Sequence, residues 1–335
     1  MSCYITACGA ALPKRIVTNV KLAPQLGVAP EWIEANSGVR ERRWVEANQS
    51  ASDLAAAAVR DALSKAGLPA NAIDYLIGGT LSPDYQVPGI APLVQRKLES
   101  CRKIPALDVR VGCTALLYSL QIARGLIASN AADTVACFGA EAQSKGLDLN
   151  PRSAELSMLF GDGAGAILVG KQPGSNLALR VDDVLLATDG SFAEELGLRA
   201  PGTGNGAHWL HGEPSLFLPN MNGRTVILHA VRKLTEATHE LLTRHQLSLN
   251  QIDWIVPHQA NLNLLRALGK KLEVDENRVV VNLDRYGNTS GAAAFLALHD
   301  VRPFLKPGAR ILIVAFGAGF TWGAALLTNH APKDM

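Results

Sequence analysis

Two kinds of hydrophobic pattern alternate along this chain, and their alternation predicts an α/β protein. Short apolar runs rich in β-branched residues are typical of buried strands, and they lie at residues 3–8, 73–77, 106–111, 134–138, 164–169, 251–256, 278–282, 310–316 and 323–327. Segments with apolar residues at helical spacing lie between them, at residues 30–37, 54–63, 91–98, 116–124, 226–244, 262–272 and 290–298. This order implies mostly parallel sheets covered by helices.

The order of elements in the first half of the chain recurs in the second half. Asp253 follows Asp74 by 253 − 74 = 179 positions, and Phe316 follows Phe138 by 316 − 138 = 178 positions. A near-constant offset over several matched elements indicates a duplicated unit. We therefore expect two α/β halves, residues 1–172 and 173–335, that form one compact body.

Cys113 lies in the turn between a predicted strand and the helix that follows it. A cysteine in this position is close to the positive end of the helix dipole and to free backbone N–H groups. Both favour the thiolate, which is the nucleophilic form. An inert buried cysteine is the alternative, because free cysteines are among the most buried residues, and the position alone leaves both interpretations open.

Three features of the second half occupy equivalent strand ends. His258 follows one strand, Asn288 opens a helix after another, and the glycine-rich turn at 317–319 can offer a backbone N–H to an oxyanion. Sites in such sheets lie beyond the carboxyl ends of the strands, so we expect His258 and Asn288 to converge on Cys113. A hydrogen-bonded framework histidine and a helix N-cap asparagine are the structural alternatives.

Composition excludes several classes of protein. The 335 residues are 48% hydrophobic and 19% charged, with a net charge of +2, which argues against a nucleic-acid-binding surface. The five cysteines are scattered and lack zinc-type spacing, so they indicate a reduced, intracellular protein. We expect a cytoplasmic protein with no membrane segment, because no apolar stretch approaches the roughly 18 residues that a span needs.

Two further motifs do not support other chemistries. The glycines at 161–165 have the wrong spacing for a dinucleotide site and precede an apolar strand instead of a helix. His208 and His211 suggest a metal site, but no further ligands accompany them, so a solvated loop is the favoured interpretation and we expect no metal.

Several motifs together resemble the β-ketoacyl-ACP synthase III family of the thiolase superfamily. They span nearly the whole chain, at residues 31–42, 107–113, 160–166, 256–261, 283–290 and 315–323. The resemblance implies a homodimer of five-layered αβαβα subunits with mixed five-stranded sheets. It also implies that Cys113, His258 and Asn288 form a Cys-His-Asn catalytic set.

The chemistry that this resemblance implies is a decarboxylative Claisen condensation, as in fatty acid biosynthesis. An acyl thioester loads Cys113, and malonyl-CoA or malonyl-ACP supplies the second substrate without any cofactor. His258 and Asn288 would hydrogen-bond the malonyl thioester oxygen. The backbone amides of Cys113, Ala318 and Gly319 would hold the tetrahedral oxyanion.

The chain matches the family pattern less closely at the residues expected to contact the substrate and the carrier protein. It suggests thioester or CoA contacts at Trp32, Arg152, Asn261 and Phe316, and docking of an acyl carrier protein at Lys270 and Lys271, for which a solvated helix face is the alternative. The chain departs from the family pattern at Asn36, Ala115, Asn263 and Val87.

A specialised branch of the family is the alternative. Residues 80–84, 107–113 and 116–125 resemble the branch that includes the anthraniloyl/malonyl condensing enzyme of alkylquinolone biosynthesis. That resemblance implies a role in secondary metabolism, with an aromatic or medium-chain acyl-CoA as donor, or simple acyl transfer without condensation.

Overall fold

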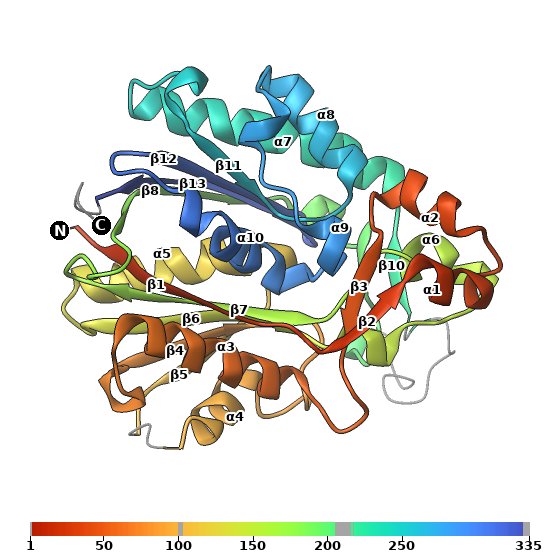
Figure 1. Ribbon diagram of the computed structural model, residues 1–335, viewed down its shortest axis with the longest axis horizontal. Coiled ribbons are helices and arrows are strands. Elements are labelled where there is room, and N and C mark those ends of the chain that lie inside the picture. The colour runs from red at the N-terminus through yellow and green to blue at the C-terminus, as the bar shows by residue number, and fades with distance from the viewer. Residues whose placement is uncertain (1, 100–102, 205–215, 217, 331–335) are drawn as a thin grey trace.

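The chain folds into alternating layers of helices and strands, which a computed structural model describes for residues 2–99, 103–204, 216 and 218–330. Figure 1 shows two groups of strands, one above the other, with α5 (Ala115–Ala128) and α10 (Ala293–Val301) between them. Helices α3 (Ala51–Ala66) and α4 (Ile90–Lys97) cover the outer face of one group. Helices α7 (Gly223–Arg244) and α8 (Leu262–Leu272) cover the other. The predicted layered α/β fold is confirmed.

The strands of the two groups follow the same order. The first group runs β1-β7-β6-β4-β5, and the second runs β8-β13-β12-β11. The bounds of these strands are β1 Tyr4–Ala11, β4 Tyr75–Gly79, β5 Ala106–Val109, β6 Thr134–Glu141, β7 Gly163–Gly170, β8 Leu179–Thr188, β11 Trp254–Pro257, β12 Arg310–Gly317 and β13 Thr321–Asn329. In each group the two central strands are antiparallel, β6 with β7 and β12 with β13, and the next strand outward is parallel.

The sheets are mixed, as the family resemblance implies, but only the first group has five described strands and the second has four. Two residue pairs between β1 and β8 join the groups, so the nine strands of the two groups form one sheet. The strand predicted at 278–282 is reduced to one bridge, between Ile255 and Val279. The Gln259 side chain binds the backbone beyond this bridge, at Val280, Asn282 and Leu283, in place of a neighbouring strand.

The smaller elements gather at one end of the molecule (Figure 1). They are β2 Arg15–Thr18, α1 Asn19–Leu26, α2 Pro30–Ser37, β3 Glu41–Trp44, α6 Ala154–Ser157, β9 Leu196–Leu198, β10 Pro219–Met221 and α9 Leu283–Tyr286. The buried guanidinium of Arg42 in β3 donates to the carbonyls of Val17 and Met158 and to the side chain of Asn19. Arg42 thereby ties β3 to β2, to α1 and to the residue after α6 within this region.

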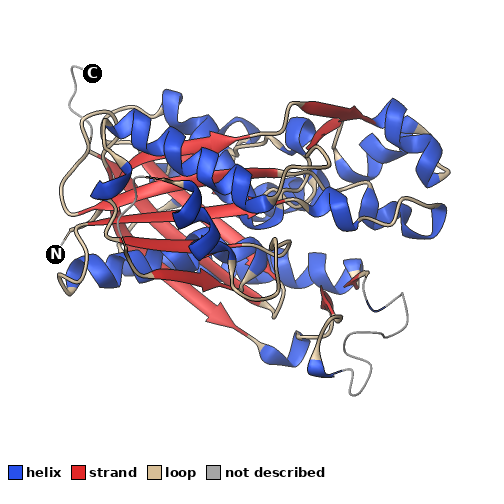
Figure 2. Cartoon of the chain, turned by 90° about the horizontal axis from the view of Figure 1, so that it is seen from below, coloured by secondary structure: helices blue, strands red, loops and turns tan. Residues whose placement is uncertain are grey.

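Close packing of helices on strands produces three main apolar cores, one in each interlayer space. The middle core combines α5 and α10 with side chains of both strand groups, such as Ile167 and Ile313. Helix α3 lies so near β1 that a Cβ on Gly9 would be 2.1 Å from the Ala58 carbonyl oxygen. Figure 2 shows the strands from below, with helices on both sides. No described helix is both long and apolar enough to span a bilayer.

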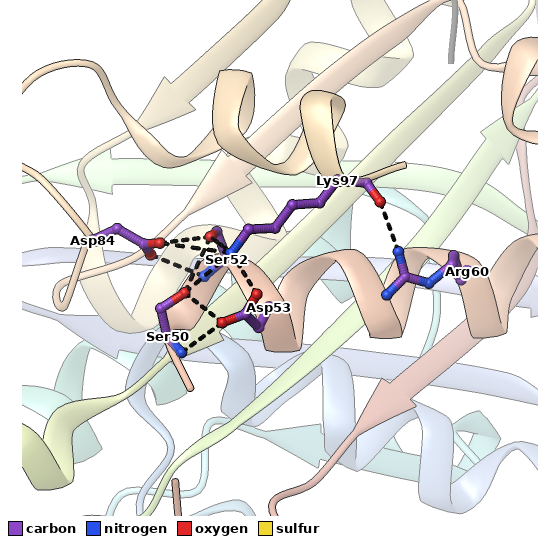
Figure 3. Close-up of polar contacts among 6 residues, drawn as sticks. All are labelled: Ser50, Ser52, Asp53, Arg60, Asp84 and Lys97. Carbon is purple, nitrogen blue, oxygen red and sulfur yellow. Dashed lines mark hydrogen bonds and ion pairs between the residues drawn. The ribbon is translucent and has the colours of Figure 1, made fainter. Parts of the chain in front are cut away.

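A polar cluster fixes the loop after β4 against the start of α3 (Figure 3). The Asp84 carboxylate accepts hydrogen bonds from the backbone N–H and the hydroxyl of Ser52, at 3.0 and 2.6 Å. The ammonium of Lys97, at the end of α4, donates to Asp53 at 2.5 Å and to Ser52 at 2.6 Å, with Asp84 3.9 Å away. Lys97 therefore holds two carboxylates of like charge together.

We predict that Lys97→Met lowers the free energy of unfolding by about 1–2 kcal/mol, because hydrogen bonds to charged groups are lost and the Asp53 and Asp84 carboxylates face each other without a counter-charge. Urea denaturation at neutral pH measures this change. Lys306→Met is the control, because Lys306 is exposed. Equal stability of the two variants would contradict the prediction.

Candidate active site

Cys113 lies in a short 3-10 turn, Gly112–Thr114, directly before α5 and after β5. Gly112 has a φ of +52°, which residues with a side chain rarely adopt. This conformation turns the chain sharply from strand to helix. The Cys113 sulfur lies 3.7 Å from the hydroxyl oxygen of Ser290, a residue of the opposite half of the chain. The turn thus presents the sulfur to the second strand group.

The expectation that helix geometry favours the Cys113 thiolate is wrong for the free site. Burial raises the pKa of the Cys113 thiol to about 12, and the nearby carboxyl of Glu141 also raises it, whereas the hydrogen bond with Ser290 lowers it. Loss of water around the charged sulfur outweighs the favourable position before the helix. Cys113 is therefore a thiol at neutral pH.

The glycine-rich turn after β12 lies directly against Cys113. A Cβ placed on Gly317 would be 3.2 Å from the Cys113 Cβ and 3.3 Å from its backbone nitrogen. The Thr321 hydroxyl donates to the Ala318 carbonyl at 3.0 Å and hydrogen-bonds with the Thr114 hydroxyl at 3.0 Å. These bonds hold the predicted oxyanion turn, with Ala318 and Gly319, beside the turn of the nucleophile.

His258 immediately follows β11, and its backbone N–H donates to the Val314 carbonyl of β12 at 2.8 Å. The imidazole is buried, and its Nδ1 has no hydrogen-bond partner in the described part of the chain. Burial lowers the pKa of His258 to about 4. The ring is therefore neutral at physiological pH, with one nitrogen able to donate and the other able to accept.

Asn288 is fixed by backbone bonds to the first half of the chain. Its N–H donates to the Leu159 carbonyl at 2.8 Å, and its own carbonyl accepts from Gly161 at 3.1 Å. Its side-chain oxygen accepts the Ser290 N–H at 2.8 Å. With that oxygen used, the amide NH2 is the group left to donate to a substrate.

The structure places these elements around the carboxyl end of β12. Cys113 contacts Gly317 at the end of this strand, His258 is bonded to Val314 in it, and Ser290 connects the Cys113 sulfur to the Asn288 turn. The roles of Cys113, His258 and Asn288 in a reaction stay predictions.

The other predicted site residues lie on three different parts of the surface and core. Trp32 is half-buried on α2, and Asn261 caps α8 while donating to the Asn36 carbonyl of α2 at 2.9 Å. A cavity of ≈ 380 Å³ lies beside these two helices, lined in part by Arg40 and Arg266.

Phe316 is buried in β12 and packs on Phe320, with ring centroids 4.8 Å apart. Arg152 is exposed, pairs with Asp148 at 2.9 Å and lines a second cavity of ≈ 330 Å³. Lys270 and Lys271 are exposed in the last turn of α8.

His208 and His211, for which the sequence favours a solvated loop over a metal site, lie outside the described residues. Within the described ranges, no group of three or more His, Cys, Asp or Glu side chains is arranged to hold a metal ion.

Glu141 is a site residue that sequence reasoning missed. It ends β6, is fully buried, and accepts hydrogen bonds from the Ser82 hydroxyl at 2.6 Å, the Leu81 N–H at 3.1 Å and the Gly291 N–H at 3.2 Å. It therefore joins the loop after β4 to the turn that carries Ser290. The one available signal was a lone acidic residue closing an apolar strand.

Comparisons with known proteins identify similar chains over nearly the full length. Residues 107–190 match the profile of the family described as 3-Oxoacyl-[acyl-carrier-protein (ACP)] synthase III, and residues 242–329 match the profile of its C-terminal part. A β-ketoacyl-[acyl-carrier-protein] synthase III of Oleidesulfovibrio alaskensis is 38% identical, with 97% of this chain and 98% of the relative covered.

Solved structures agree with this likeness. The synthase III of Thermus thermophilus matches with a TM-score of 0.86 at 38% identity, covering 97% of this chain and 98% of that chain. The 3-oxoacyl-[acyl-carrier-protein] synthase III of Aquifex aeolicus matches with a TM-score of 0.86 at 33% identity, covering 97% and 99%.

We predict that Glu141 makes the stability of the protein fall as the pH rises towards 7. Burial raises the pKa of Glu141 from 4.5 to about 7. The stabilising contribution of the protonated carboxyl to the free energy of unfolding is therefore fully present below about pH 4.5 and is lost as the pH passes about 7. The Glu141→Gln variant resembles the protonated carboxyl and should lack this fall. Between pH 5 and pH 8, the wild type should lose about 2–3 kcal/mol relative to the variant.

Urea denaturation at a series of pH values measures this difference, with Glu155→Gln, a change at an exposed carboxyl, as the control. A difference between wild type and Glu141→Gln that stays constant with pH would contradict the prediction.

Proposed function

Since this chain belongs to the 3-oxoacyl-[acyl-carrier-protein] synthase III family, we propose that it is an acyltransferase that condenses an acyl thioester with a malonyl thioester and releases CO2. The observation that carries this proposal is the contact of the Cys113 sulfur with the turn of Asn288 and Ser290 from the opposite half. A nucleophile and a hydrogen-bond donor, supplied by two halves, share one site.

In the first half of the reaction, Cys113 becomes acylated. The sulfur attacks the thioester carbonyl, a new carbon–sulfur bond forms, and the bond to the leaving thiol breaks. Because Cys113 is a thiol at neutral pH, its proton must leave as the bond forms. His258 is neutral, because burial lowers its pKa to about 4, so the ring is free to accept this proton. The same low pKa means that the protonated ring holds the proton weakly and passes it on to the leaving thiolate.

In the second half, the malonyl thioester loses CO2. As the carbon–carbon bond breaks, negative charge develops on the thioester oxygen, and His258 and the Asn288 amide donate hydrogen bonds to it. The carbanion then attacks the acyl carbonyl on Cys113. The backbone amides of Cys113 and of Ala318 or Gly319 hold the resulting oxyanion until the Cys113 sulfur departs.

The substrates in this scheme are an acyl-CoA and malonyl-CoA or malonyl-ACP, and no step in it uses a metal or a cofactor. Trp32 on α2 and Asn261, the N-cap of α8, are proposed as thioester contacts. The ≈ 380 Å³ cavity beside these helices is lined by their neighbours, such as Ala35 and Leu262. Phe316 and Arg152 are proposed as further contacts of this kind.

Exposed Lys270 and Lys271 form a basic patch that suits an acidic carrier protein. We propose further that the protein is a homodimer and is located in the cytoplasm. We also propose that its two duplicated halves are residues 1–172 and 173–335, a boundary that falls between β7 and β8.

We favour the fatty-acid type of reaction over the specialised alternative. The synthase III of Oleidesulfovibrio alaskensis that supports this choice covers nearly the whole chain at 38% identity. An acyl-CoA panel, read by intact-protein mass, separates the two. Loading by short aliphatic donors supports the fatty-acid reaction, whereas loading by aromatic or medium-chain donors alone supports the specialised branch.

We predict that Cys113→Ala abolishes the acyl adduct on the protein while the fold is retained, because the attacking sulfur is gone. Intact-protein mass after incubation with the acyl-CoA panel measures the adduct, and circular dichroism checks the fold. Cys3→Ala, a change at a buried cysteine, should still be acylated. An adduct persisting on Cys113→Ala would place the nucleophile elsewhere.

For Asn288→Ala, we expect acylation close to that of the wild type but release of CO2 from malonyl thioester slowed about 100-fold, because one donor to the developing oxyanion is lost. A single-turnover assay with labelled malonyl-CoA measures this release. Asn71→Ala, at an exposed position, should behave as the wild type. Unchanged CO2 release from Asn288→Ala would refute this role.

A further inference from the structure

Ser290 is buried beside the nucleophile, and nothing in the scheme above uses its side chain. Its side-chain oxygen lies 3.7 Å from the Cys113 sulfur, a distance at which sulfur forms hydrogen bonds, and the residue is 1% exposed. The serine is therefore shielded from solvent, whereas Cys113 beside it is half-buried.

The backbone of Ser290 adopts a conformation that serine rarely takes. Its φ is +42°, in the left-handed region that costs free energy for a residue with a side chain. Two side chains hold it there: Asn288 accepts the Ser290 N–H at 2.8 Å, and Glu141 accepts the Gly291 N–H at 3.2 Å.

The wall behind this turn is also rigid. A Cβ on Gly139 of β6 would be 2.1 Å from the Gly291 carbonyl oxygen, so the turn packs directly on the strand backbone. Its surroundings thus hold the backbone of the strained serine in place. Strain held in this way is typical of functional positions.

The protonation state of the sulfur decides which group donates. In the thiol, either the sulfur or the hydroxyl can be the donor. A thiolate has no proton, so the hydroxyl must donate to it, and a hydrogen bond to a charged acceptor is stronger than one between neutral groups. The contact therefore stabilises the charged form of Cys113 more than the neutral form.

We propose that Ser290 is a further catalytic residue, whose hydroxyl donates a hydrogen bond to the Cys113 thiolate each time that thiolate forms. This rests on the proposed function. The thiolate forms twice in a cycle, as the attacking group in acylation and as the leaving group when the condensation product departs. One hydroxyl thereby assists both steps, and it opposes the effect of the Glu141 carboxyl, which raises the pKa of Cys113.

The test is the alkylation of Cys113 by iodoacetamide between pH 6 and pH 9, followed by mass analysis of the peptide that contains it. In this range the rate follows the thiolate fraction. Ser290→Ala and Ser290→Gly both remove the hydroxyl, and both should react about tenfold more slowly than wild type at each pH. Ser290→Gly also removes the strain, so it keeps the comparison valid if Ser290→Ala is destabilised.

Ser119→Ala is the matched control. Ser119 lies in α5, and its buried hydroxyl has no hydrogen-bond partner in the described part of the chain. This variant should alkylate as the wild type does. Each serine truncation opens space, so a purely steric role of Ser290 would raise the rate, and either a raised or an unchanged rate in both Ser290 variants would overturn the proposal.

The outcome is separate from that of the proposed function. Iodoacetamide reports on the sulfur whatever the natural substrate is. Failure of wild-type Cys113 to accept any acyl group from the acyl-CoA panel would reject the condensing reaction but leave the alkylation result standing.

Discussion

The site depends on the direct contact between two turns, residues 112–114 from one half and residues 288–291 from the other. Backbone meets backbone there. A Cβ on Gly291 would lie 3.0 Å from a Glu141 side-chain oxygen and 3.4 Å from the Gly112 carbonyl oxygen. A Cβ on Gly165 would lie 2.4 Å from the Cβ of Phe295, so α10 packs tightly onto β7 as well. These contacts leave little room for a side chain at Gly291 and none at Gly165. Because packed interiors deform little, they fix the sulfur relative to the hydrogen-bonding groups.

Electrostatics in this site follows from the same close packing. Burial keeps His258 neutral, keeps Cys113 protonated and raises the pKa of Glu141. His258 and Cys113 are therefore uncharged at neutral pH, and Glu141 titrates close to it. Charge appears on the sulfur and on the substrate oxygen during the reaction, and fixed hydrogen-bond donors replace water in stabilising it.

Much of the fold could be predicted because local signals and tertiary structure agree. Helices α2 and α8 begin and end at the predicted residues, and Gly67 ends α3 in the left-handed conformation expected of a helix C-cap. The recurrence of elements in the second half could be predicted because each half repeats the same hydrophobic pattern, and the two strand groups follow the same order. The strand at 278–282 could not be predicted correctly from its apolar residues. A 3-10 turn runs to Arg278, and the Gln259 side chain binds the Val280 carbonyl and the Asn282 N–H.

The site was predictable in its residue types but not in its chemical state. The positions of Cys113, His258 and Asn288 follow from strand ends and from family resemblance. The raised pKa of Cys113 depends on burial by residues distant in sequence, which a local reading of the helix dipole does not include. Glu141 and Ser290 were missed for a related reason. Glu141 binds backbone groups of two separate loops, and the Ser290 hydroxyl contacts a sulfur that is 177 residues away in the sequence.

The middle layer also has a consequence for synthesis on the ribosome. Leu116, Leu117 and Leu120 of α5 pack in the same core as Ile311, Ile313 and Leu327 from the end of the chain. While the nascent protein emerges, its first strand group can assemble, but the apolar face of α5 waits uncovered until the last strands arrive. Each newly made molecule therefore passes through a stage at which it is prone to aggregate through this exposed apolar surface. Chaperones that shield apolar surface would act on this face of α5.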